Sequence, residues 1–192
     1  MFTKNYINDI KYNIYLPQIF YMNLIVYIIA YPLMWLISRM GFRMLYIFSD
    51  FMYYILYYIF KYRIKVVREN LKLAFPEMPN DQRISIEKKY YRYLADIFLE
   101  SFKSMNISES EMKKRYKFKN PELIEKIYKK NQNLILIAGH YCSWEWVFIL
   151  DRFTNYRINA IYKKLSNKYF DRWAKRNRSR YNGNLISTKD TF

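Results

Sequence analysis

The feature that most constrains the fold is a run without charged side chains from Leu16 to Ser38, rich in Ile, Leu, Tyr and Phe. A helix needs about 20 such residues to cross the hydrocarbon core of a bilayer. Pro17 fits the first turn of this helix, whereas Pro32 is expected to kink or end it. A cleaved signal peptide is the alternative, but the run is long for one and no small-x-small cleavage site follows it. The sequence therefore predicts an uncleaved membrane anchor over residues 1–43.

Basic residues are distributed unevenly on the two sides of this run. Arg39 and Arg43 follow it at once and further Lys and Arg continue to Arg68, whereas only Lys4 and Lys11 precede it, with an aspartate between them. Loops rich in Lys and Arg remain on the cytoplasmic side of a membrane. The chain after the anchor is therefore expected in the cytoplasm.

A second apolar run, Met44 to Phe60, contains many tyrosines and one charged residue, Asp50. It is short for a membrane crossing and fits better a helix that lies in the bilayer interface. The basic stretch from Lys61 to Arg68 suits contact with anionic headgroups, with a solvated helix face as the alternative. Residues 44–70 are thus predicted to form an interfacial helix and a basic segment.

The composition indicates an anionic partner. The chain has 33 Lys and Arg against 16 Asp and Glu, a formal charge of +17, which favours nucleic acid, anionic lipid or an acidic carrier protein. The aromatic residues lie mostly in apolar runs rather than among the basic residues, which favours a membrane surface over nucleic acid. Cys142 is the only cysteine and His140 the only histidine, so an intrachain disulfide and a zinc site rich in these ligands are excluded.

The remaining residues, 71–192, show the pattern of an α/β domain. A long amphipathic helix is expected from Asn80, and then strands and helices alternate. This alternation predicts a mostly parallel sheet with helical crossovers. The expected elements are a buried strand at Asn133–Gly139, a helix from about Trp144, a strand at Ile158–Tyr162, a helix from Leu165 or Ser166 to about Arg178, and a strand from Asn184 to Ser187.

His140 directly follows the first of these expected strands, where α/β sheets bind ligands. Its ordinary pKa of about 6.5 suits a general base at neutral pH. On one continuous helix Glu145 would lie about 140° away. If His140 is in a loop and Glu145 in the first helical turn, the carboxylate can fold back and orient the imidazole. A substrate hydroxyl would then be the nucleophile, and the helix start could donate backbone N–H groups to an oxyanion.

Other interpretations of the same residues remain open. His140 could be an ordinary packed side chain, since most single histidines have no catalytic role. Cys142 and His140 could form a nucleophile pair that carries an acyl group. A protein of another class, a membrane-anchored basic protein without enzymatic activity, would also bind anionic lipid or nucleic acid.

The run Gly139–Trp146, with His140 and Glu145 in His-x-x-x-x-Glu spacing after an apolar segment, resembles the motif of the lipid A biosynthesis acyltransferases, the lauroyl/myristoyl acyltransferase family. Further blocks agree in the same order along the chain, and the resemblance covers nearly all of it. They are the stretches Tyr62–Leu71, Ala74–Glu77 and Ile161–Asp171, and the triplet Arg178-Ser179-Arg180.

The resemblance implies a lysophospholipid-acyltransferase-like α/β domain, with helices around a mostly parallel sheet, behind one N-terminal transmembrane helix at the cytoplasmic face of the cell inner membrane. It implies transfer of a fatty acyl chain from acyl carrier protein to a hydroxyl of a lipid A precursor, without cofactor, metal or nucleic acid. By position, His140 is the general base and Glu145 its orienter. Contacts to substrate phosphate or to the carrier fall to Lys163, Asn167, Arg178 and Arg180, for which a solvated basic helix is the alternative.

One departure from the family concerns the C-terminal side. Members continue past the position of Phe192 with strands and helices that complete the sheet and the acyl groove, so a C-terminally incomplete domain is expected. Another glycolipid or a lysophospholipid is the alternative acceptor. An inactive, truncated, membrane-anchored basic protein that binds anionic lipid is the alternative function, and dependence on His140 separates it from an enzyme.

Overall fold

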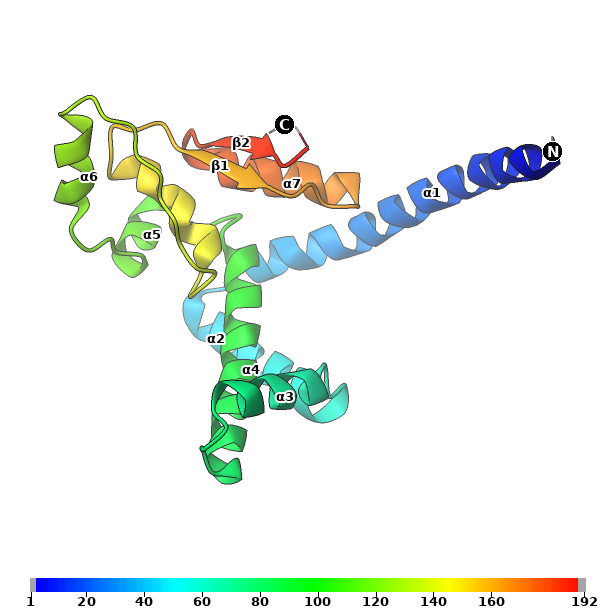
Figure 1. Ribbon diagram of the computed structural model, residues 1–192, viewed down its shortest axis with the longest axis horizontal. Helices are drawn as coiled ribbons and strands as arrows, with labels where there is room; N and C mark the ends of the chain where they lie inside the picture. Colours follow the sequence, from blue (N-terminus) through cyan, green and yellow to red (C-terminus); the bar gives the residue numbers. More distant parts are fainter. Residues whose placement is uncertain (1–2, 190–192) are drawn as a thin grey trace. The chain divides into compact units, whose positions relative to one another are not determined.

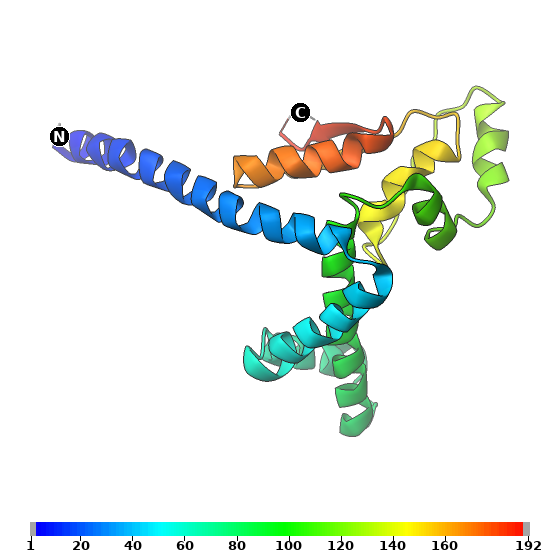
Figure 2. The same ribbon diagram turned by 180° about the vertical axis from the view of Figure 1, so that it is seen from behind.

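The structure, a computed structural model, describes the backbone of residues 3–189 and the side chains of residues 21–189. The described chain forms two compact units. The helical unit contains residues 35–108 and 139–146, and the sheet unit contains residues 3–34, 109–138 and 147–189. Figures 1 and 2 show the elements of both units from opposite sides.

The first helix, α1 (Thr3–Arg39), contains the predicted anchor. Tyr21–Arg39 has a mean hydropathy of 1.6 and is mostly exposed, with 11% buried, and in the described part of the chain it is the segment long and apolar enough to cross a membrane. The helix continues through Pro32, because a proline removes one hydrogen bond of the ladder and leaves the others. The start of the predicted run, Leu16–Phe20 with Pro17, lies outside the described side chains.

The helical unit is built around α4 (Asn80–Lys103), the long helix predicted from Asn80. Beside it lie α2 (Phe42–Tyr54), a π-helical turn η1 (Ile55–Ile59) and α3 (Ile64–Ala74). The buried residues of α2 and η1 recur every four positions, and so do those of α4, as two packed helix faces require. They are Leu45, Ser49, Tyr53 and Tyr57 on the first face, and Glu87, Tyr91, Ala95, Leu99 and Lys103 on the second.

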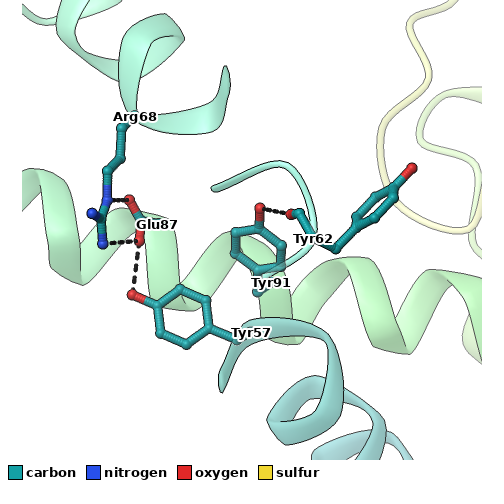
Figure 3. Close-up of polar contacts among 5 residues, drawn as sticks. All are labelled: Tyr57, Tyr62, Arg68, Glu87 and Tyr91. Atoms are coloured by element: carbon teal, nitrogen blue, oxygen red, sulfur yellow. Dashed lines mark hydrogen bonds and ion pairs between the residues drawn. The ribbon is translucent and has the colours of Figure 1, made fainter. Parts of the chain in front are cut away.

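A buried carboxylate joins three elements of this unit (Figure 3). Glu87 is 1% exposed and accepts a hydrogen bond from the Tyr57 hydroxyl (2.7 Å). The Arg68 guanidinium donates to both of its oxygens (2.9 and 3.2 Å). Burial, followed by the hydrogen bond to Glu87, raises the pKa of Tyr57 to about 12. Because a buried charge is tolerated only with partners, the Glu87 pairing holds η1, α3 and α4 in one arrangement.

At the other end of α4, a buried cation also connects separate elements of the helical unit. The Lys103 ammonium, 9% exposed, donates to the carbonyl oxygens of Ser38 (2.8 Å) and Met40 (2.6 Å) and lies 5.4 Å from the centre of the Phe42 ring. The last carbonyls of a helix lack intrahelical partners, and a cation is favourable there. Lys103 therefore caps the C-terminal end of α1 and ties it to α4.

After the larger part of α1, the sheet unit contains α5 (Glu109–Arg115), α6 (Pro121–Tyr128) and most of the 3-10 helix η2 (Trp144–Arg152). β1 (Asn159–Tyr162) and β2 (Asn184–Ser187) then pair in parallel, from Asn159 opposite Asn184 to Tyr162 opposite Ser187. Between them come α7 (Lys168–Arg178), which lies along the strand pair in Figure 1, and a short turn η3 (Ser179–Tyr181). The predicted strand–helix–strand crossover after residue 158 is confirmed.

The predicted strand at Asn133–Gly139 is wrong. These residues have no regular secondary structure, and Ile135 and Ile137 are 86% and 91% exposed. A short apolar run does not reveal whether a strand partner exists, and in the described residues the sheet consists of β1 and β2. The structure is therefore mostly helical with a two-stranded parallel sheet, and the larger lysophospholipid-acyltransferase-like sheet stays a prediction.

Candidate active site

The loop that carries the histidine, here called the His140 loop (residues 139–146), belongs to the helical unit. The amide of Tyr141 donates to the Gly139 carbonyl (2.9 Å) and the amide of Trp144 donates to the Cys142 carbonyl (2.8 Å). Between these tight turns Cys142 has a φ of 56°, in the left-handed region that non-glycine residues seldom adopt. The chain thus reverses within a few residues and leaves His140 exposed ahead of η2.

Two side chains of α4 hold this loop in place. The Tyr93 hydroxyl accepts a hydrogen bond from the backbone N–H of Cys142, the residue with the left-handed conformation. The Ser143 hydroxyl donates to the Glu100 carboxylate. The indole N–H of Trp146 donates to the backbone carbonyl of Glu100 (3.1 Å). Because α4 is fixed by its own buried contacts, the loop is positioned from a rigid element.

The two anchoring side chains are themselves supported. Burial, followed by a hydrogen bond with the Cys142 side chain, raises the pKa of Tyr93 to about 12, although the backbone N–H of Cys142 lowers it in part. The Tyr93 hydroxyl therefore stays neutral at physiological pH. The second carboxylate oxygen of Glu100 accepts a hydrogen bond from the Tyr46 hydroxyl on α2 (2.7 Å). Neither Tyr93 nor Glu100 was predicted from the sequence to be functional. Both lie on the long helix α4, and the sequence of this helix contains no motif that would single them out.

His140 lies in the loop before η2, and Glu145 lies within η2. The imidazole packs against the Trp144 ring with 4.8 Å between ring centroids, and Glu145 lies in the first turn of η2, as the sequence predicted. Among the described residues no hydrogen bond joins the imidazole to the carboxylate. Catalytic hydrogen bonds are often long in structures without substrate, so the orienting role of Glu145 stays a prediction.

The backbone at the start of η2 has less donor capacity than the sequence suggested. The N–H of Trp144 donates to Cys142, and the N–H of Trp146 donates to the Ser143 carbonyl (2.8 Å). These two groups close the turns of the loop. An oxyanion would have to bind other donors, unless these two backbone hydrogen bonds break.

The four predicted substrate-binding residues lie in the sheet unit and fall into two groups. Lys163 follows β1 and Asn167 precedes α7, so both lie at the carboxyl end of the strands. Arg178 ends α7 and Arg180 lies in η3, at the other end of the helix. A helix of 11 residues is about 16 Å long. One phosphate group is therefore too small to contact both pairs.

Asn167 has a structural function. Its side-chain oxygen accepts hydrogen bonds from the amides of Tyr169 (3.0 Å) and Phe170 (3.4 Å), which makes it the N-cap of α7. Its side-chain nitrogen donates to the Asn23 carbonyl on α1 (2.9 Å). Both ends of the amide are thus engaged within the sheet unit.

A lysine at the carboxyl edge of the sheet was not predicted from the sequence to be a site residue. Because Tyr162 and Ser187 pair at the ends of the parallel strands, Lys189, just beyond β2, reaches the same edge as Lys163. The Thr188 amide donates to the Tyr162 carbonyl (3.0 Å) and extends the pairing toward it. The register of two strands separated by a crossover was needed to recognise this pair.

The sheet unit also contains an apolar cavity of about 640 Å³. It is lined by the apolar segment at Leu134–Leu136, by η2 through Phe148 and Leu150, and by β1 through Ala160. Small-molecule pockets commonly have volumes of about 300–1,000 Å³ and mostly apolar walls. The cavity therefore has the size and the lining of a site for an apolar group.

Comparison with known proteins agrees with the family resemblance of the sequence. The family model described as bacterial lipid A biosynthesis acyltransferase matches residues 16–192. The match includes the His140 loop, α4 and the whole strand–helix–strand segment. No curated protein matches the chain.

Proposed function

Because the chain belongs to the bacterial lipid A biosynthesis acyltransferase family, we propose that it moves a fatty acyl chain from acyl carrier protein to a hydroxyl of a lipid A precursor, with His140 as general base. The family assigns an acyltransferase function and a lipid A-type acceptor. The donor, the secondary type of acylation and the roles of individual residues belong to the proposal.

The proposed step is a direct transfer. The imidazole of His140 takes the proton of the acceptor hydroxyl while the hydroxyl oxygen attacks the thioester carbonyl carbon. The carbon–sulfur bond then breaks, the ester remains on the acceptor, and the carrier thiolate takes the proton from the His140 imidazolium, which regenerates the base. Glu145 orients the imidazole and stabilises its protonated form, as the acid does in a Ser-His-Asp arrangement.

The observation that carries this proposal is the anchored His140 loop. The imidazole is exposed and can reach a substrate, while the backbone beside it is held by Tyr93 and Glu100 of α4. A packed core histidine would be buried, and His140 is not. The chemistry needs a base that is accessible and well positioned, and this loop combines the two properties.

The apolar cavity of the sheet unit is the proposed site of the acyl chain. Its lining offers Leu, Ile, Ala and Phe side chains, which suit a hydrocarbon. Lys163 and Lys189 at the carboxyl edge of the strands are the proposed contacts to phosphate, since ligands of α/β sheets bind at this edge. Arg178 and Arg180 form a separate basic site, proposed for the acidic carrier protein.

The proposed location is the cytoplasmic face of the cell inner membrane, with α1 as a bilayer-spanning anchor. The length and hydropathy of Tyr21–Arg39 support it. A helix as basic as α7 cannot lie in hydrocarbon. The hydrogen bond between Asn167 and Asn23 is therefore expected to be released when α1 crosses the bilayer.

The test is a transfer assay on membranes that contain the full chain, with radiolabelled acyl carrier protein thioester and a lipid A precursor. His140→Ala is expected to lower the rate by about 10²–10⁴-fold, the usual contribution of a general base. Glu145→Gln is expected to lower it less, because the base remains. Cys142→Ser is the matched control in the same loop and should retain activity.

Other outcomes contradict specific parts of the proposal. Equal transfer by the parent and by His140→Ala would exclude His140 as the base. Loss of transfer in Cys142→Ser, with trapping of an acyl group on the parent, would favour a cysteine nucleophile. Transfer to a lysophospholipid and not to the lipid A precursor would change the acceptor and leave the base in place.

A further inference from the structure

We propose that the helical unit docks on the surface of an anionic bilayer through one face of α2 and η1. This outer face consists of exposed apolar side chains spaced three or four residues apart, as one side of a helix requires. Its members are Met44, Ile47, Phe51, Tyr54 and Tyr58. Phe60, 72% exposed, follows at its end.

The opposite side of the same elements fixes the direction of the outer face. Leu45, Tyr53 and Tyr57 are buried against α4, and Tyr57 is tied to Glu87 by a hydrogen bond. Turning the outer face inward would break that pair and expose the core. A contiguous apolar surface that cannot be turned inward is typical of an interaction site.

The connection to α1 identifies the occupant as a membrane. α1 ends at Arg39 and α2 begins at Phe42, so only two residues separate them. Each residue spans at most about 3.6 Å, and Lys103 ties the end of α1 to α4. Where α1 leaves the bilayer, the outer face is within a few residues of the headgroups. This step rests on the proposed membrane anchor.

The charges beside the outer face match an anionic lipid surface. Arg43 lies at its start, and Lys61, Arg63 and Lys65 follow its end, all exposed. The one acidic residue of the run, Asp50, lies 3.9 Å from the Arg92 guanidinium, which offsets its charge. Apolar side chains, tyrosine hydroxyls and flanking cations together are the composition of interfacial helices.

Docking in this way has a consequence for the reaction. The C-terminal part of α4 binds the His140 loop through Glu100 and the end of α1 through Lys103. The rings of Phe42 and Trp146 meet edge to face at 6.3 Å. The outer face, the exit point of α1 and the general base thus belong to one unit, which would hold His140 near the headgroups, where a lipid acceptor presents its hydroxyl.

The test measures the depth of single positions in the full chain. In a Cys142→Ser background, one cysteine is introduced at Ile47 or Phe51, and as a matched control at Lys88 on the exposed side of α4. Each is labelled with an environment-sensitive fluorophore and reconstituted in vesicles of phosphatidylcholine and phosphatidylglycerol. Labels at Ile47 and Phe51 should shift to the blue, be quenched by nitroxide lipid and resist iodide. The label at Lys88 should show the reverse.

Two results would overturn the proposal. Labels at Ile47 and Phe51 that are as accessible to iodide as the label at Lys88 would show that the face is in water. Labels protected from iodide but not quenched by nitroxide lipid would show that a protein, or a second copy of the chain, covers it. Neither readout depends on transfer activity, so the docking and the catalytic proposal fail separately.

Discussion

The two units differ in how their interiors treat polar groups. The helical unit buries a carboxylate and an ammonium, Glu87 and Lys103, and each has at least two hydrogen-bond partners. The sheet unit has an open apolar cavity, and its buried oxygens Asp151 Oδ2, Tyr162 Oη and Tyr181 Oη have no partner among the described residues, whereas the described part of the helical unit has one such oxygen, Ser49 Oγ.

This difference suggests that the two units have different functions. Paired buried charges hold a backbone in one arrangement, because breaking a pair leaves an uncompensated group. The helical unit is therefore suited to positioning the His140 loop. Exposed apolar side chains such as Ile135 line the cavity, so the sheet unit is the one with room for an apolar ligand. Four predictions test this comparison.

The largest effect is expected at the link between α4 and the His140 loop. Glu100→Ala removes the acceptor of the Ser143 hydroxyl and should lower kcat by up to about 100-fold, because small displacements of a catalytic group are costly. KM should change little. Glu100→Gln keeps an oxygen acceptor and should recover most of the rate. Equal losses in both variants, or a rise in KM alone, would argue against a positioning role.

The second prediction concerns the buried carboxylate. Glu87→Ala leaves the Tyr57 hydroxyl buried without an acceptor, which costs about 1–3 kcal/mol of unfolding free energy. The Arg68 side chain is 57% exposed and can return to water, so it adds little. Glu87→Gln keeps an acceptor and should lose less. Thermal unfolding of the full chain in detergent measures both, and identical stability of all three proteins would show that the helical unit does not depend on this pair.

A smaller effect is expected from filling the cavity of the sheet unit. Ala160→Phe occupies volume that the proposal assigns to the acyl chain, so transfer of long chains should fall relative to short ones by at least about tenfold, the lower end of the usual discrimination for one methylene group. Ser166→Phe adds the same side chain at an exposed position outside the lining and is the control. A uniform loss for all chain lengths would mean that the cavity does not determine the preference for acyl-chain length.

The smallest effect is expected from Asp151, and it depends on pH. Burial raises the pKa of this carboxyl, although the Ile158 amide and nearby arginines lower it in part. Between the usual and the raised pKa the folded state binds more protons than the unfolded state, so the contribution of Asp151 to stability falls as pH rises. Asp151→Asn is neutral at every pH and can still accept from Ile158.

The melting temperature of Asp151→Asn minus that of the parent should therefore increase as pH rises from about 4 to neutral. A difference that is constant with pH would show that the carboxyl has its ordinary pKa in the folded protein. Such a result would also weaken the contrast between the two interiors, since Asp151 would then be well solvated.

Local pattern was enough to predict much of the chain. The apolar run before Arg39, the long helix from Asn80, the helix start at Trp144 and the crossover that includes α7 all appear as expected. Each is set by helix or strand periodicity and by caps that lie within a few residues. The strand expected at Asn133–Gly139 failed because a strand also needs a partner, which its own residues do not reveal.

The candidate site likewise has features that the sequence predicted and features that depend on the tertiary structure. The sequence by itself determined the chemistry available, since it holds one histidine, one acidic residue five positions later, and a basic segment from Lys163 to Arg180, in the order of one family. Only the tertiary structure decided which α4 residues hold the His140 loop, that Lys189 reaches the same sheet edge as Lys163, and which face of α2 remains exposed. These properties depend on contacts between residues far apart in the chain, and such contacts leave no local pattern to read.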